Sequence, residues 1–116
     1  MRSQLPKMNE AEFTRQVLQL AALCGWRTIH LRPALTRHDR WVTPVQGDGV
    51  GFPDIFAIHP GRGVVLAAEL KIGRRKPTPA QTAWLDAMRA AGIAAYCWVP
   101  ADWKYIEAVL KGENVR

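Results

Sequence analysis

Asp54, Glu69 and Lys71 are the residues of this chain whose types and spacing could do chemistry. Asp54 precedes a short apolar run, and Glu69 and Lys71 end a second run, with a proline and two glycines between the runs. This pattern predicts a β-hairpin that brings its two ends back to the same edge of a sheet. Because Glu69 and Lys71 are two positions apart in a strand, both side chains should point to one face.

Such a hairpin places two carboxylates and one ammonium group together. Two neighbouring carboxylates repel each other unless a cation lies between them, and their oxygens are ligands that hard ions such as Mg²⁺ prefer. A lysine beside them can orient a water molecule or hold a phosphate oxygen. Asp54 and Glu69 therefore predict a divalent-metal site, with Lys71 next to it.

The elements that must position this cluster can be predicted from periodicity and capping residues. Apolar residues recur at helical spacing over residues 10–24, between an N-cap at Asn9 and Gly25. A second helix should begin at Thr78 and Pro79 and end at Gly92. Strands are predicted at residues 26–32, 55–58, 64–70 and 93–99, and a final helix at residues 101–111.

This order of elements predicts an α/β fold with a mixed sheet of about four strands flanked by helices. The helix before residues 93–99 permits a crossover to a parallel strand. Residues 93–99 are continuously apolar, so we expect that strand in the centre of the sheet. At 116 residues we expect a single domain over residues 1–116, with residues 1–8 a loose leader and residues 112–116 a tail.

Composition restricts the function classes. The formal net charge of +6 suits a polyanionic partner, of which nucleic acid is the commonest. No apolar run approaches the ~20 residues of a membrane span, and the N-terminus does not have the pattern of a signal peptide, so we expect a cytoplasmic protein that meets no membrane. Cys24 and Cys97 have no metal-binding spacing and are expected to be buried free thiols.

Two basic segments are candidates for nucleic-acid binding. Residues 34–50 show little periodicity, and a loop of this length is commonly functional or disordered. Arginines can bind phosphates, and a tryptophan can stack on a base. In this loop and just before it, these residues are Arg32, Arg37, Arg40 and Trp41. The alternative is a solvated loop anchored by its tryptophan. The second segment is a basic turn made of Arg74, Arg75 and Lys76, which could contact phosphate or form a solvated turn.

Three stretches together resemble the VRR-NUC family of the PD-(D/E)XK nuclease superfamily. They are Gly51-Phe52-Pro53-Asp54, Glu69-Leu70-Lys71 and Thr78-Pro79-Ala80-Gln81 with the following Trp84-Leu85. The resemblance runs from about Glu12 to the end of the last helix. It implies a restriction-endonuclease-like core and an endodeoxyribonuclease that depends on Mg²⁺ or Mn²⁺. It also implies metal ligation by Asp54, Glu69 and the backbone carbonyl of Leu70.

The resemblance assigns further roles to four residues. Lys71 would orient the attacking water or neutralise developing charge, and Gln81 would position the water or the lysine. An acid on the first helix would reach the metal site, and Glu12 matches that position best, with Glu10 as the fallback. Both Glu12 and Gln81 also have structural readings. Glu12 completes a capping box with Asn9, and Gln81 could be an ordinary first-turn glutamine.

The resemblance also implies the substrate and partners. Related stand-alone domains come from phage and bacterial genomes and act on branched DNA such as Holliday junctions or flaps. A two-fold symmetric junction would call for a homodimer. The alternative function is a non-catalytic DNA-binding or assembly subunit that retains the nuclease fold, and the intact Asp54, Glu69, Lys71 and Gln81 set argues against it. An RNA-binding protein would explain the charge but not the acidic cluster.

Overall fold

The computed structural model describes residues 8–31, 34–35, 41–42 and 47–113. In that part of the chain, four strands form one mixed sheet in the order β1-β4-β5-β6. Their bounds are Arg27–His30 for β1, Ile55–His59 for β4, Val64–Leu70 for β5 and Ala94–Trp98 for β6. The helices are α1 (Glu10–Leu23), α2 (Pro79–Ala90) and α3 (Trp103–Lys111), and a 3-10 turn, η1 (Pro100–Asp102), precedes α3. The predicted α/β class with a mixed sheet is confirmed.

The predicted hairpin is formed by β4 and β5. They pair antiparallel, with Ile55 opposite Ala68, so Asp54 and Glu69 meet at the end of the hairpin away from its turn. β1 pairs antiparallel with β4 on the other side. The chain leaves β5, forms α2 and returns as β6, which runs parallel to β5, so the predicted crossover is also confirmed.

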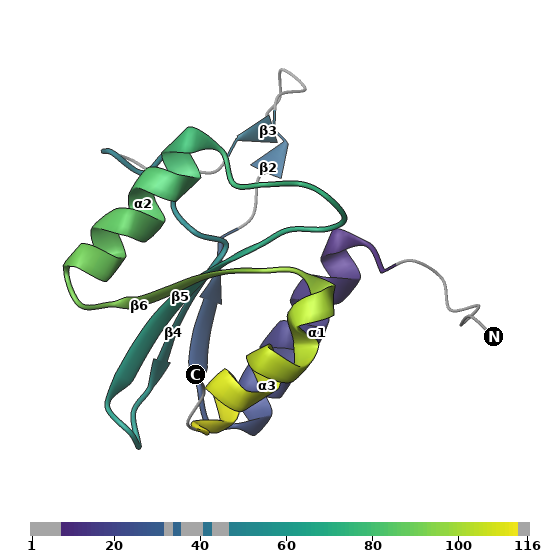
Figure 1. Cartoon of the computed structure of the whole chain (residues 1–116), viewed down its shortest axis with the longest axis vertical. Helices are drawn as coiled ribbons and strands as arrows, with labels where there is room; N and C mark the ends of the chain where they lie inside the picture. The colour runs from purple at the N-terminus through teal and green to yellow at the C-terminus, as the bar shows by residue number, and fades with distance from the viewer. Residues whose placement is uncertain (1–7, 32–33, 36–40, 43–46, 114–116) are drawn as a thin grey trace.

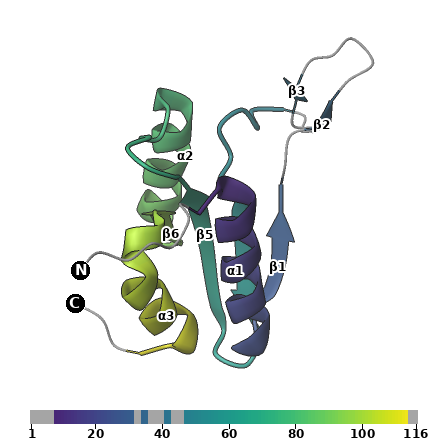
Figure 2. The same ribbon diagram turned by 90° about the vertical axis from the view of Figure 1, so that its right-hand side faces the viewer.

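Helices cover both faces of the sheet (Figures 1 and 2). α1 and α3 lie side by side on one face, and α2 lies on the other. β5 is buried on both faces, because Leu66 and Leu70 pack in the core cluster that includes α1 and α3 residues, whereas Ala67 packs with Leu85 and Met88 of α2. A strand buried on both faces has little freedom to move, which makes β5 a rigid support for Glu69.

The prediction that the strand at residues 93–99 lies in the centre of the sheet is wrong. Among the described strands, β6 pairs with β5 alone and stands at the end of the strand order. Its apolar sequence has a different cause. Ala95 packs with the residues of α2 on one face, and Trp98 packs with the other core cluster on the opposite face. Helices on both faces, rather than strands on both sides, account for the continuous apolar run.

Residues 34–50 contain a small strand pair that the sequence analysis did not predict. β2 (Ala34–Leu35) and β3 (Trp41–Val42) pair antiparallel, with Leu35 opposite Trp41. Arg32, Arg37 and Arg40 lie outside the described residues, and of Trp41 only its place in β3 is described. Their expected contacts with nucleic acid therefore stay predictions, as do the leader and the end of the tail.

Two simpler expectations can be compared directly with the structure. Cys24 and Cys97 are both free thiols, as expected, and both are partly buried. In the described residues, no helix is both long enough and apolar enough to cross a membrane.

Candidate active site

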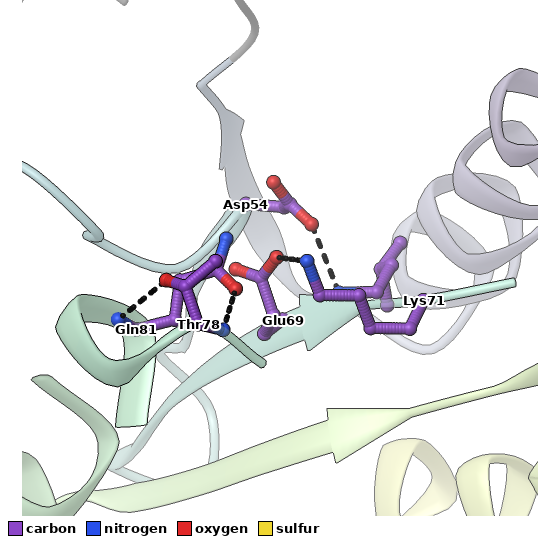
Figure 3. A network of polar contacts seen from close by, with 6 residues as sticks. Asp54, Glu69, Lys71, Thr78 and Gln81 are labelled. Atoms are coloured by element: carbon purple, nitrogen blue, oxygen red, sulfur yellow. Dashed lines mark hydrogen bonds and ion pairs between the residues drawn. The ribbon is translucent and has the colours of Figure 1, made fainter. Parts of the chain in front are cut away.

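The hairpin brings Asp54, Glu69 and Lys71 together (Figure 3). The Lys71 Nζ atom lies 3.2 Å from Oε2 of Glu69. The backbone N–H of Leu70 donates to Oδ2 of Asp54 at 2.9 Å, which links the Asp54 side chain to the strand that carries Glu69. The predicted cluster of two carboxylates and one ammonium group is thus present at the end of β5.

Neighbouring strands hold the backbone of this cluster on both sides. The N–H of Leu31, just after β1, donates to the carbonyl of Asp54 at 2.8 Å. The N–H of Lys71 donates to the carbonyl of Trp98 in β6 at 2.9 Å. Because the cluster is tied to the elements that flank the hairpin, its side chains start from fixed backbone positions, as a preorganised site requires.

Glu69 is buried in an unusual way for a carboxylate. Only 2% of the residue is exposed, and its Oε1 atom has no hydrogen-bond partner in the described part of the chain. Burial, followed by the negative charge of Asp54, raises the pKa of Glu69 from 4.5 to about 7, while Lys71 acts in the opposite direction. A buried acceptor without a partner is costly, so this atom is a candidate ligand position.

The donor chemistry of this cluster fits a hard divalent cation. In the described residues, no group of three His, Cys, Asp or Glu side chains is arranged to hold a metal ion. Mg²⁺, however, usually keeps several waters and is bound through one or two carboxylates. Asp54 and Glu69 supply these two carboxylates, and the buried Oε1 atom of Glu69 has no hydrogen-bond partner among the described residues.

Gln81 and Glu12 have equivalent places at the starts of their helices. The Thr78 N–H donates to Oε1 of Gln81 at 2.8 Å, and the Gln81 N–H donates to Oγ1 of Thr78 at 3.2 Å (Figure 3). The Asn9 N–H likewise donates to Oε1 of Glu12 at 3.1 Å, completing a second capping box. Both side chains therefore have the structural role that the sequence allowed.

A groove of about 1110 Å³ opens between α1 and the cluster, and only one of these two capping residues, Gln81, lines it. Asp54, Glu69, Lys71 and Gln81 line one side of it. On the α1 side the groove is lined by Glu10, whereas Glu12 is not among its lining residues. With its oxygen held by Thr78, the amide group of Gln81 still has an NH₂ that can donate. Glu10, the fallback in the sequence analysis, is thus the first-helix acid beside the groove.

The loop that leads to Asp54 is fixed to the first turns of α2. Gly51 has a φ of +87°, and a Cβ atom built there would lie 2.6 Å from the carbonyl carbon of Ala80. The Trp84 indole N–H donates to the carbonyl of Asp48 at 3.1 Å, and the Trp84 ring meets the Phe52 ring edge-on. These contacts hold the loop that leads to Asp54 against the helix that carries Gln81.

The basic turn of Arg74, Arg75 and Lys76 follows the cluster directly. All three side chains are exposed, and none forms an ion pair with another residue in the described ranges. Their charges therefore remain available to an anionic partner that reaches the groove.

Sequence reasoning missed the groove-facing surface of α1. Arg15, Gln19 and, at the end of β1, His30 line the groove along with the cluster. A weak signal was present, because Arg15 and Gln19 are four residues apart and flank the apolar face of the predicted helix. Nothing in the sequence showed that this flank would face the carboxylates.

Comparison with known proteins supports the fold. No family model matches the chain, and none of the curated proteins does. A solved structure titled "VRR_NUC domain" matches with a TM-score of 0.54, covering 84% of this chain and 92% of that one at 22% sequence identity. This chain has the fold of a VRR_NUC domain. The resemblance read from the sequence is confirmed at the level of the fold. In this chain, the cluster lies at the end of the β4–β5 hairpin.

Proposed function

We propose that this chain is a metal-dependent endodeoxyribonuclease that hydrolyses phosphodiester bonds in branched DNA. The observation that carries the proposal is the buried Glu69 carboxylate, with an unpartnered oxygen, beside Asp54 and Lys71 in an open groove. The likeness to a solved VRR_NUC domain supports it, because that fold is the one the sequence motifs suggested.

Asp54, Glu69 and the backbone carbonyl of Leu70 would hold Mg²⁺ or Mn²⁺. When bound, such an ion supplies positive charge that stabilises the phosphate oxygens and acidifies the attacking water. The two carboxylates are the chain's own contribution, and the bond from the Leu70 N–H keeps Asp54 turned towards β5.

Lys71 and Gln81 would act on the reacting groups. The Lys71 ammonium group, 3.2 Å from Glu69 Oε2 and largely buried, can orient the attacking water or neutralise charge that develops on the phosphate. The NH₂ of Gln81 can donate to the same water or to a phosphate oxygen. Burial strengthens the interaction of Lys71, because water competes less for its charged group.

We propose that Glu10 is the first-helix acid that completes the site and that Glu12 is a capping residue. The alternative is that Glu12 completes the site. The support is positional, since Glu10 lines the groove and the Glu12 carboxylate accepts the Asn9 N–H. Because the two residues are two positions apart on a helix, their side chains project about 200° from each other, so they cannot face the groove equally.

DNA with a junction or flap is the proposed substrate, and a homodimer the proposed assembly on a symmetric junction. The net charge of +6 and the exposed basic turn support an extended contact with phosphates. Arg32, Arg37, Arg40 and Trp41 remain proposed DNA-binding residues on the strength of their types alone.

The experiment is a cleavage assay on labelled four-way junction, flap, single-stranded and duplex DNA, each with Mg²⁺, Mn²⁺ or EDTA. We expect cutting that needs a divalent ion and favours a branched substrate. Absence of cutting on every DNA, together with binding that is indifferent to metal, would contradict the proposal and favour the non-catalytic DNA-binding subunit.

A further inference from the structure

The groove has a second wall whose chemistry differs from that of the carboxylate cluster. Seven residues of α1 and its cap line it, from Asn9 to Ala22, a length of about 20 Å at 1.5 Å per residue. This wall is several times longer than one phosphate step in B-DNA, about 3.4 Å per strand. The groove can therefore hold more than the nucleotide whose phosphate reacts.

Arg15 and Gln19 are two polar side chains on this wall that extend into solvent. Arg15 and Gln19 are exposed, and in the described part of the chain neither forms an ion pair or a hydrogen bond through its side chain. They are four residues apart and so lie one turn from each other on the same flank of α1. Arg15 can pair its positive charge with a phosphate, and the amide of Gln19 can both donate to and accept from a base edge.

Apolar side chains also line the groove. They include Leu18, Ala22 and Leu31, and Leu18 and Leu31 are each partly exposed. The N–H of Leu31 donates to the carbonyl of Asp54, so Leu31 lies next to the cluster. Leucine side chains open to a groove gain free energy when another apolar surface covers them.

The faces of DNA bases are such a surface, and only unpaired DNA can offer them. In a duplex the base faces are stacked on one another, and only the charged backbone and the base edges in the grooves stay accessible. A base that has left the stack exposes its flat face, which protein side chains can cover. A groove of about 1110 Å³ also exceeds the usual 300–1,000 Å³ of a small-ligand pocket.

We propose that the α1 wall binds an unpaired DNA strand continuous with the phosphate that is cut. One or more bases lie against Leu18 and Leu31, Arg15 pairs with a backbone phosphate, and Gln19 bonds to a base edge. This inference deepens the proposed function and rests on it for the identity of the strand as substrate. It selects DNA with a single-stranded arm over a fully paired junction.

The test is binding in EDTA, measured by fluorescence anisotropy with a labelled single strand and with the duplex of the same sequence. Two substitutions have matched controls. Gln19→Glu adds a negative charge inside the groove and Gln16→Glu adds it on the same helix outside the groove. Arg15→Gln removes a charge that lines the groove, and Arg27→Gln removes an exposed charge that does not. We expect each groove variant to weaken single-strand binding about tenfold or more and each control less than threefold.

An abasic version of the single strand separates base contacts from phosphate contacts. We expect it to bind several-fold more weakly than the normal strand, because the apolar contact is lost while every phosphate remains. Equal binding of the normal and abasic strands would overturn the base contact, and equal effects of Gln19→Glu and Gln16→Glu would overturn the α1 wall as the binding surface.

The outcome is independent of whether the chain cuts DNA. Loss of single-strand binding in the groove variants, with no cleavage under any condition, would support the binding inference and contradict the nuclease. Metal-dependent cleavage with duplex and single strand bound equally, and with controls and groove variants alike, would overturn the inference and leave the nuclease standing.

Discussion

Glu69 is the residue on which stability and function make opposite demands. Its pKa is raised to about 7, first by burial and second by Asp54. An unfolded chain releases this proton near pH 4.5, whereas the folded protein keeps it until about pH 7. Between these values the folded state binds more protons, so the free energy of unfolding must fall as the pH rises. The site is stable when protonated and ready for a cation when it is not.

Replacing Glu69 by Gln should remove this pH dependence. In EDTA, we expect the free energy of unfolding of Glu69→Gln to exceed that of the native chain by a margin that grows from about pH 4.5 to about pH 7. Urea unfolding of both proteins across this range measures the margin. Asp86→Asn is the control, since Asp86 is an exposed carboxylate on α2 outside the groove. A margin that stays constant with pH would contradict the raised pKa.

Glu10 and Glu12 make a second prediction at the residue scale. Glu10→Gln should lower cleavage about 10- to 100-fold with little change in stability, because Glu10 lines the groove. Glu12→Gln should leave cleavage within about twofold, since glutamine can still accept the Asn9 N–H in the capping box. Single-turnover rates and thermal unfolding of both variants separate the roles, and a larger loss of activity in Glu12→Gln would reverse the assignment.

At the scale of elements, the contact between the loop before Asp54 and α2 determines how the two halves of the site face each other. Gly51 and Gly47 both have a positive φ, +87° and +72°. A Cβ atom at Gly51 would lie 2.6 Å from the Ala80 backbone, whereas one at Gly47 would meet none of the described residues within 4 Å. Comparing alanine substitutions at the two glycines therefore distinguishes the stability lost through backbone conformation from the stability lost through a steric clash.

Gly47→Ala should cost about 1 kcal/mol of stability, from the left-handed backbone alone. Gly51→Ala should cost clearly more, because the loop must also move away from the first turn of α2. Denaturant unfolding measures both values. Equal losses in the two variants would mean that the loop yields freely and does not position Asp54 against Gln81.

Local signals predicted most of these elements, and their limits have physical causes. Asn9 and Thr78 mark helix starts because their side chains satisfy the first free N–H groups, and both capping boxes form as expected. The β4–β5 hairpin followed from one proline–glycine turn between two apolar runs. The order of the strands could not be predicted in this way. An apolar run indicates only that both faces of a strand are covered, and in β6 helices cover both faces.

The candidate site was predictable where one hairpin determines it, and not where a separate element contributes. Asp54, Glu69 and Lys71 are held together by pairing within β4 and β5. The α1 wall is brought to them by tertiary packing, so neither Arg15 nor Gln19 could be assigned to the groove from the sequence. The choice between Glu10 and Glu12 has the same origin, because a helix phase cannot be fixed without its neighbours.

For the whole molecule, the excess of positive charge predicts salt-dependent binding. Each phosphate neutralised contributes about 0.7–0.9 to the slope of log affinity against log salt. Changing Arg74, Arg75 and Lys76 together to Gln should reduce that slope by about 2 and weaken binding of all DNA substrates alike. Lys104→Gln, an exposed charge on α3, should change it little. An unchanged slope in the triple variant would show that this turn is merely solvated.

The most direct test of the account is the single-turnover rate of DNA cleavage, with enzyme in excess and Mg²⁺ or Mn²⁺ present, for Asp54→Asn, Glu69→Gln and Lys71→Ala beside the native chain. We predict that each variant stays folded and binds DNA but loses cleavage by at least on the order of 10²- to 10³-fold, while Asp86→Asn cuts as the native protein does. Metal-dependent cleavage that survives in all three variants would place the reaction elsewhere in the molecule and contradict the account.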